Sequence, residues 1–163
     1  MTQQCEVVVV GRGLIGSAAA RHLAEAGIST ALVGAGEPCD YEASDGPFAS
    51  HYDEGRITRI TASNPIWSEL ATRSIGRYCD IAERSGIEFH SACRLAYSSN
   101  TAETDMDDAV KRGADVRLVT QQWLRETTGI QVPRENSGPI VFEGAPAGLI
   151  NPRRLVAAQT ALA

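Results

Sequence analysis

The feature that most constrains the fold of this chain is a valine strand that leads, through three closely spaced glycines, into an alanine-rich helix. The strand covers Val7–Val10, and residues 11–16 follow it directly with the sequence GRGLIG. A strand, a glycine turn and a helix N-terminus in this order bind the pyrophosphate of a dinucleotide. Three glycines in six residues also arise by chance, and the alternative is a turn that only packs. The position between strand and helix favours a dinucleotide site.

Each glycine of this turn has its own physical task. Gly11 permits a tight turn, Gly13 lets a phosphate approach the backbone, and Gly16 lets the helix lie against the strand. The helix begins with Leu14 and Ile15, whose N–H groups have no partner inside the helix. Together with the positive end of the helix dipole, these groups face the phosphates. These five residues are the first candidate ligands of a cofactor.

The first 33 residues predict one βαβ unit. We expect a strand at about Glu6–Val10, a helix at about Leu14–Ala26 and a second strand at Ile28–Val33. Gly27 is the expected C-terminal stop of the helix. The right-handed crossover rule makes the two strands parallel. The predicted fold class is therefore α/β, with a Rossmann-like parallel sheet.

The rest of the chain alternates loops, helices and strands. Residues 34–56 lack periodicity, and a loop of that length in a compact domain is usually functional or mobile. Thr120 and Asn151 are predicted helix caps, the latter followed by Pro152 at the first helical position. The last helix reaches Ala163 without a glycine stop, so we expect its apolar face to lack half of its packing partners. Further helices are expected at 66–84, 104–112 and 120–127, and strands at 88–98, 116–119, 139–142 and 148–150, the last two joined by a turn at 143–147.

Charge and hydropathy exclude several classes of partner. The net charge of −5 argues against nucleic acid and against a membrane surface, because both select proteins with a basic face. No apolar run reaches the roughly 18 residues that a membrane helix requires. The N-terminus enters a strand directly, which leaves no room for a signal peptide. We therefore expect a cytoplasmic protein.

The residues that could ligate a metal predict no metal site. The four cysteines have spacings that match no metal motif, so free thiols in a reducing compartment are expected. The three histidines are scattered along the chain. The acidic group at residues 105–108 is better explained as favourable charge at a helix N-terminus.

Three stretches of the chain together resemble one protein family. They are VVVVGRGLIGSAAARHLAEAG at 7–27, SHYDEGRITRI at 50–60, and AGLINPRRL at 147–155. The second is similar to an SHxxxxRIxR pattern and the third to a G-x-(I/L)-x-P-x-x-L pattern. With them the chain resembles, from end to end, the N-terminal part of the D-amino-acid-oxidase-like FAD-dependent oxidoreductases. The branch that it resembles most is that of sarcosine oxidase and the N-methyl-amino-acid oxidases.

The resemblance implies roles for the matching residues. Arg56 would lie against the flavin ring, where a fixed cation stabilises negative charge on the reduced ring. Arg59 would hold a substrate carboxylate in its guanidinium fork. Ser50, His51 and Ile57 would contact the cofactor. Without the resemblance, two arginines three residues apart are a solvated face and His51 is a surface loop histidine; residues 52–54 are treated as loop.

The end of the second strand departs from the family pattern. This fold normally places Asp or Glu there to bind the ribose hydroxyls of the adenosine. The register puts Gly34 at that position, and the nearest acid is Glu37. Either Glu37 reaches back to the ribose, or backbone and water hold it. No arginine stands at the strand end, so a ribose 2′-phosphate, and hence NADP, is not favoured.

Members of this family are well over twice as long as the chain. The resemblance implies an FAD-binding part at 1–85, the start of a substrate domain at 86–142, and a return to the FAD domain at 143–163. It also implies a second polypeptide that carries the rest of both domains. The implied activity is oxidation of a C–N bond in a small amine or amino acid to an imine, with hydride transfer to FAD and release of hydrogen peroxide.

Two alternatives from other classes stay open. One is a non-catalytic nucleotide-binding fragment that serves assembly with a partner chain, which Gly34 and the short chain favour. The other is an NAD-dependent dehydrogenase, which the glycine turn allows. The SHxxxxRIxR stretch and the C-terminal pattern do not fit that enzyme.

Overall fold

A computed structural model describes residues 4–46, 49–131 and 138–163 of the chain. Contacts divide the chain into two compact units. Unit 1 comprises Met1–Arg56, Tyr78–His90 and Ile150–Ala163, and unit 2 comprises Ile57–Arg77 and Ser91–Leu149. The units are defined by contacts and not by function, so the expected domain boundaries stay a prediction. No helix in the described part of the chain is long and apolar enough to cross a bilayer.

Unit 1 begins with the predicted βαβ arrangement. Strand β1 (Val7–Val10), helix α1 (Leu14–Glu25) and strand β2 (Thr30–Val33) follow one another, and Gly27 at φ +76° ends the turn after the helix. The strands pair in parallel, with Val7 opposite Thr30 and Val10 opposite Val33. The expected α/β class and the parallel pairing are confirmed.

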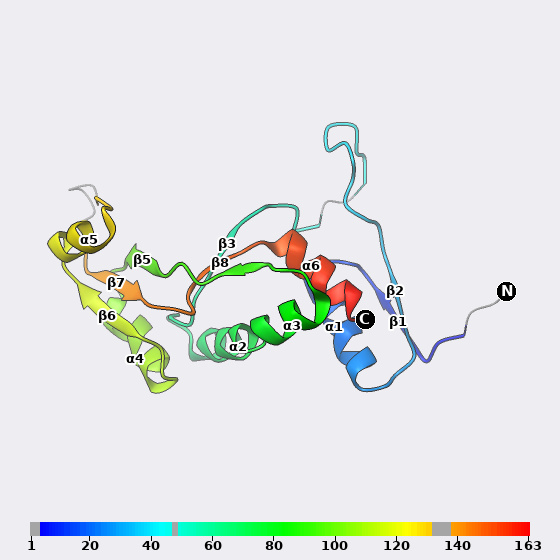
Figure 1. Cartoon of the computed structure of the whole chain (residues 1–163), viewed down its shortest axis with the longest axis horizontal. Coiled ribbons are helices and arrows are strands. Elements are labelled where there is room, and N and C mark those ends of the chain that lie inside the picture. Colours follow the sequence, from blue (N-terminus) through cyan, green and yellow to red (C-terminus); the bar gives the residue numbers. More distant parts are fainter. Residues whose placement is uncertain (1–3, 47–48, 132–137) are drawn as a thin grey trace. The chain divides into compact units, whose positions relative to one another are not determined.

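Helix α6 (Pro152–Ala161) packs beside α1, and α3 (Tyr78–Ser85) also contacts it (Figure 1). The Asn151 side chain accepts a hydrogen bond from the Arg154 N–H at 3.0 Å, which is the predicted N-cap. Leu155, Val156 and Ala158 of α6 are buried. The expectation that this helix lacks half of its packing partners is therefore wrong, because α1 and α3 cover its apolar face.

Unit 2 is built on an antiparallel sheet with the order β5-β7-β6. Its central strand β7 (Ile140–Glu143) is buried at every position. Strand β5 (Leu95–Ser98) pairs with one edge of β7 and β6 (Val116–Val119) with the other. Helix α4 (Ala102–Lys111) packs on β6 and β7, and α2 (Pro65–Ile75) packs on α4. Helix α5 (Gln121–Thr128) is capped by the predicted Thr120.

A third sheet has the strand order β3-β8-β4. Its members are β3 (Arg56–Thr58), β8 (Gly148–Ile150) and β4 (His90–Ser91). A Cβ on Gly148 would stand 2.0 Å from the Ser91 carbonyl oxygen, so only glycine permits this approach. Strand β7 includes Glu143, so the connection to β8 covers residues 144–147, and the two strands that it joins belong to different sheets.

Two long elements predicted from the sequence are each divided in two. The expected helix at 66–84 is α2 and α3, separated at Gly76, whose flexible backbone disfavours a helix interior. The expected strand at 88–98 is β4 and β5. Between them Arg94 adopts φ 70° and donates its N–H to the Ala147 carbonyl, so the strand direction changes there. The cysteines are free, as predicted, and exposed.

Glu25 on α1 generates a stability prediction for unit 1. Its carboxylate accepts hydrogen bonds from Arg84 of α3 and from Arg21, which is 3% exposed. The Arg84 hydrogen bond, followed by Arg21, lowers the pKa of Glu25 from 4.5 to about 2. Glu25→Gln removes the counter-ion of a buried guanidinium, so we expect the free energy of unfolding to fall by about 1–3 kcal/mol at pH 7.

A lowered carboxyl pKa contributes stability that is present above the unfolded value and lost as the pH falls through the folded value. The difference between wild type and Glu25→Gln should therefore shrink between pH 4.5 and about 2. Urea titrations at several pH values measure it. Glu83→Gln changes an exposed carboxylate on α3 and serves as the control. If Glu25→Gln and Glu83→Gln lower the free energy of unfolding equally, the ion pairs of Glu25 do not stabilise unit 1.

Candidate functional site

The glycine turn between β1 and α1 is held by direct backbone contact. Gly11 adopts φ +111°, and a Cβ on Gly16 would stand 1.7 Å from the Gly11 carbonyl oxygen. Gly13 caps α1 with an extended backbone, without any side-chain hydrogen bond, and the first turn of the helix carries no acidic residue. The N–H groups at this helix start are thus not satisfied by a capping side chain, which is the condition for binding an anion there.

The end of β2 lies against this turn. The Gly11 N–H donates to the Val33 carbonyl at 2.7 Å. A Cβ on Gly34 would stand 2.8 Å from the Arg12 backbone nitrogen and 3.3 Å from the Gly11 Cα. With this backbone, position 34 has no space for a side chain, and the carboxylate that the fold normally carries at this strand end has no place there.

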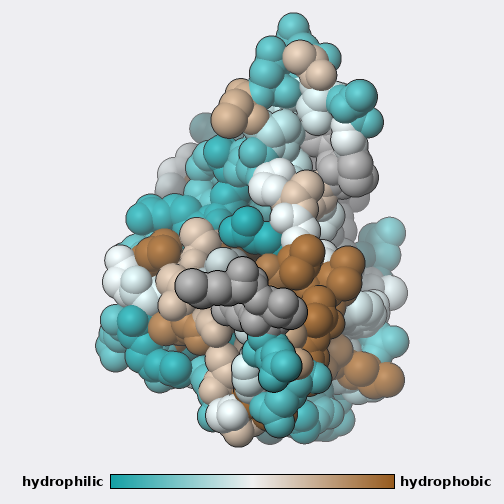
Figure 2. Space-filling view, turned by 90° about the vertical axis from the view of Figure 1, so that its right-hand side faces the viewer, coloured by the Kyte–Doolittle hydropathy of each residue, from teal (hydrophilic) through white to brown (hydrophobic). Residues whose placement is uncertain are grey.

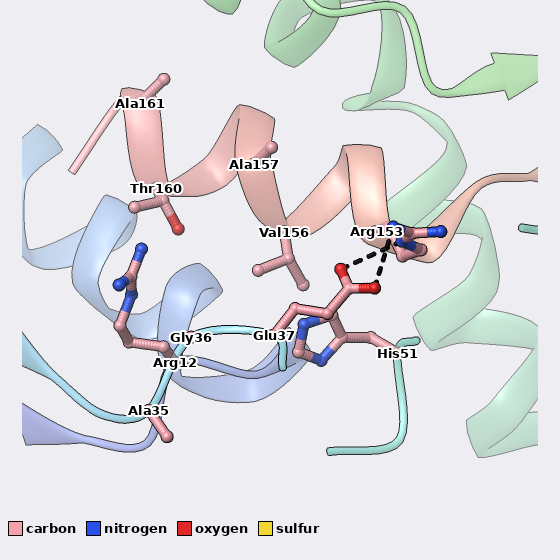
Figure 3. Close-up of a pocket in the computed structure, with 10 residues that line it drawn as sticks. All are labelled: Arg12, Ala35, Gly36, Glu37, His51, Arg153, Val156, Ala157, Thr160 and Ala161. Atoms are coloured by element: carbon pink, nitrogen blue, oxygen red, sulfur yellow. Dashed lines mark hydrogen bonds and ion pairs between the residues drawn. The ribbon is translucent and has the colours of Figure 1, made fainter. Parts of the chain in front are cut away.

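Unit 1 contains a cavity of about 430 Å³ beside the turn (Figure 3). Three segments far apart in the sequence contribute to it: the glycine turn, the loop after β2, and helix α6. The lining residues are Arg12, Ala35, Gly36, Glu37, His51, Arg153, Val156, Ala157, Thr160 and Ala161. Each of the three stretches that carry the family resemblance contributes a residue to the lining: Arg12 from the first, His51 from the second and Arg153 from the third.

His51 is a buried member of the cavity wall. Its side chain is 7% exposed, and its Nδ1 has no hydrogen-bond partner among the described residues. A Cβ built on Gly13 would stand 3.8 Å from this Nδ1, so the imidazole lies beside the glycine turn. Burial lowers the pKa of His51 below its ordinary value, which keeps the ring neutral at pH 7. An unpartnered polar atom in this position is suited to a ligand.

Glu37 is held by α6. The Arg153 guanidinium contacts both oxygens of Glu37, with Nε at 3.0 Å and Nη2 at 2.8 Å. The Tyr41 hydroxyl also donates to Glu37, and this hydrogen bond, followed by Arg153, lowers the pKa of the carboxyl. Figure 3 shows the Glu37 carboxylate facing Arg153 beside the His51 ring. Glu37 therefore lies in the cavity as an ionised group with a fixed orientation.

Two acidic loop residues for which the sequence predicted no function, Asp53 and Glu54, each bind an arginine. Asp53 accepts from Arg56 Nε at 2.9 Å and Nη2 at 2.6 Å, and this pairing lowers the pKa of Asp53. Glu54 binds Arg153 and accepts from the Asn151 amide at 2.7 Å. The spacing of three residues could have indicated the Asp53–Arg56 pair. The Glu54–Arg153 pair joins residues far apart in the sequence and has no local signal.

The remaining predicted residues lie in different places. Arg56 has a side chain 40% exposed and is not in the cavity wall, and Ser50 is exposed. Ile57 and Arg59 belong to unit 2, and Ile57 is 64% exposed. The Arg59 guanidinium carbon lies 4.3 Å from the centroid of the Tyr97 ring, a cation–π contact that orients its plane.

The glycine turn yields a prediction that separates binding from folding. Gly13→Ala adds a methyl group whose nearest neighbour is His51 Nδ1 at 3.8 Å, so the fold should be kept within about 1 kcal/mol. Because the methyl stands where a phosphate must approach, the affinity for a dinucleotide should fall about tenfold or more, roughly 1.4 kcal/mol. Gly16→Ala, with its contact to Gly11, should lower Tm strongly instead.

Thermal unfolding and titration of flavin fluorescence measure the two effects. Wild-type affinity for FAD in Gly13→Ala would show that the turn is not the phosphate site.

The chain was compared with known proteins. The model of the family described as FAD dependent oxidoreductase (DAO) matches residues 6–163. Comparison with curated proteins gives no match. L-proline dehydrogenase from P. horikoshii has a similar structure, with a TM-score of 0.73 at 16% identity over 99% of this chain and 42% of that chain. Glycine oxidase from Geobacillus kaustophilus is also similar, with a TM-score of 0.68 at 21% identity over 99% of this chain and 44% of that chain.

A modified fructosyl peptide oxidase from Aspergillus nidulans has a TM-score of 0.70 at 14% identity, over 96% of this chain and 38% of that chain. At these identities the structural likeness establishes the fold. The chain spans about two fifths of the length of these proteins. Given the match over residues 6–163 and the shared fold, the chain belongs to the family of FAD dependent oxidoreductases.

Proposed function

We propose that this chain is the N-terminal part of an FAD-dependent oxidase of the sarcosine oxidase branch. The enzyme oxidises a C–N bond of a small amine or amino acid to an imine. The observation that carries the proposal is the cavity of unit 1, where the glycine turn meets His51 of the SHxxxxRIxR stretch and Arg153 of the third stretch. The names of the similar structures, which include an L-proline dehydrogenase and a glycine oxidase, support this class of substrate.

The residues of this cavity fit a dinucleotide. The N–H groups of Leu14 and Ile15 bind the pyrophosphate, and the bare backbone of Gly13 lets it approach. The buried Nδ1 of His51 supplies one further polar contact. A carboxylate has about four acceptor sites, so Glu37 keeps capacity for ribose hydroxyls beyond its bonds to Arg153 and Tyr41. Glu37 thereby takes the place of the missing acid at Gly34.

FAD, when bound, would supply the redox chemistry, as acceptor of a hydride from the carbon beside the amine. The residues of this chain bind and orient the cofactor and the substrate. Arg56, whose guanidinium is fixed by Asp53, would supply a cation to the flavin ring. Arg59 holds the substrate carboxylate through its guanidinium N–H groups while its flat face rests on Tyr97.

One alternative keeps a specific observation in its favour. The steric exclusion of an acid at Gly34 is compatible with a non-catalytic nucleotide-binding fragment that serves assembly. An NAD-dependent dehydrogenase has no comparable support, because the family of this chain is FAD dependent.

A second polypeptide completes the enzyme in this proposal. In unit 1, Val8 and Val10 of β1 and Val33 of β2 are 55%, 83% and 52% exposed. Figure 2 views the molecule from the side on which these strands lie, and apolar surface is gathered there. In unit 2, Ile66 and Trp67 of α2 are 65% and 66% exposed. Grouped apolar side chains of this kind mark surfaces that another polypeptide covers.

Native mass spectrometry of the purified protein tests the assembly. We expect a complex that contains this chain, a longer second chain and one FAD, because the similar structures are more than twice as long. The chain alone, without a nucleotide, would contradict the two-chain proposal.

Arg59→Ala tests the substrate contact in the assembled enzyme. Loss of a bidentate, charge-assisted hydrogen bond to the substrate carboxylate should raise KM for carboxylated amines by about 10- to 100-fold, roughly 1.5–3 kcal/mol, with flavin still bound. Amines without a carboxylate should be unaffected. Arg73→Ala removes an exposed arginine of α2 in the same unit and serves as the control. An unchanged KM would remove the proposed role of Arg59.

A further inference from the structure

Unit 2 contains a buried carboxylate that the proposed function has not used. Glu143, at the end of β7, is 1% exposed. Its Oε1 accepts the Ile60 N–H at 2.7 Å. Its Oε2 accepts the Thr61 N–H at 3.0 Å and the Thr61 hydroxyl at 2.5 Å. Glu143 forms no ion pair within the described part of the chain, so backbone and hydroxyl donors alone balance it.

A buried carboxylate is costly unless hydrogen bonds replace its hydration. An apolar residue would fill the end of β7 without this cost. The three donors all belong to Ile60 and Thr61, two adjacent residues that lie about 80 positions earlier in the sequence. The consequence of the arrangement is that the backbone directly after Arg59 is fixed to the central strand of the sheet.

The side chain of Arg59 is fixed to the same sheet. Its guanidinium lies over the Tyr97 ring on β5, and β5 pairs with β7. In this pairing Leu95 stands opposite Glu143 and Tyr97 opposite Val141, so the two anchors are two positions apart along the ladder. Burial raises the pKa of Tyr97, so its ring stays a neutral support at physiological pH. Arg59 is thus held at its backbone and at its guanidinium by neighbouring points of one rigid element.

We propose that Glu143 is a positioning residue for Arg59, acting through the Ile60 and Thr61 amides to hold the guanidinium where it binds a substrate carboxylate. The inference rests on the proposed role of Arg59. It adds a residue outside the SHxxxxRIxR stretch to the determinants of specificity for carboxylated amines.

Glu143→Gln tests the inference in the assembled enzyme. The amide cannot accept all three hydrogen bonds, so we expect KM for a carboxylated amine to rise about tenfold, with kcat changed less than about threefold and flavin still bound. In the Arg59→Ala background the same substitution should change KM no further, because positioning a residue that is absent has no effect. Glu103→Gln, an exposed carboxylate on α4, is the matched control.

A second readout does not depend on activity. Amide hydrogen exchange at Ile60 and Thr61, measured by NMR on this chain, should accelerate in Glu143→Gln and stay unchanged in Glu103→Gln. Thr61→Val removes only the hydroxyl donor and should give a smaller rise of both the exchange rate and KM. It replaces Glu143→Gln if that variant fails to fold.

The outcomes separate the two hypotheses. An unchanged KM in Arg59→Ala would overturn the proposed function of Arg59 and the inference with it. A raised KM in Arg59→Ala, together with a wild-type KM in Glu143→Gln, would overturn the inference alone. A lower Tm in Glu143→Gln with wild-type KM would likewise show that Glu143 serves only the fold. Additive effects of the two substitutions would show that Glu143 does not act through Arg59.

Discussion

The close backbone contact at the glycine turn is the constraint on which the site of unit 1 depends. Because Gly16 has no side chain, α1 starts against the Gly11 carbonyl, and because Gly34 has none, the end of β2 lies against Arg12. The two contacts bring helix start and strand end to the same point. They also decide where an acid can stand: not at the strand end, but three residues later at Glu37, where the loop has turned toward α6.

The described residues of the loop after β2, at 34–46 and 49–55, form no helix or strand, and ion pairs attach the ends of this loop to α6. Arg153 is the centre of this attachment. It pairs with Glu37 near the start of the loop and with Glu54 near its end, while Asn151, the cap of the same helix, also donates to Glu54. Partly exposed ion pairs contribute little to stability one by one. Joined on one arginine at a helix start, they hold both ends of the loop to α6, and Arg153 and Glu37 line the cavity.

Features with a local physical cause could be predicted from the sequence. The parallel βαβ unit follows from a valine strand, a glycine turn and a helical period, and the caps Thr120 and Asn151 follow from side chains that accept an N–H within three residues. The two failures have different causes. The break at Gly76 is local, since glycine disfavours a helix interior, but the apolar pattern continues across it. The break at Arg94 is nonlocal, because its N–H bonds to the Ala147 carbonyl, far along the chain.

The same distinction holds for the candidate site. His51 was predicted as a cofactor ligand, but its burial beside Gly13 depends on how a loop of more than a dozen residues folds back. Glu143 had no signal at all, since an acid at the end of a strand is normally exposed. It is a buried acceptor only because Ile60 and Thr61, about 80 positions earlier in the sequence, lie against the end of β7 and donate their N–H groups to it.

The charges around the motif arginines bear on which of them is available to a substrate. Arg56 is paired with Asp53, and Arg153 with Glu37 and Glu54. Arg59 has no carboxylate partner among the described residues; its neighbour is the neutral ring of Tyr97. A guanidinium stacked on a ring keeps its N–H groups free at the edge of its plane, where a carboxylate binds with two parallel hydrogen bonds. If Glu143 had been placed against Arg59 itself, it would have neutralised this charge. Glu143 bonds to the next two amides instead. In the proposed role, it thereby restrains the arginine and leaves its charge for a ligand.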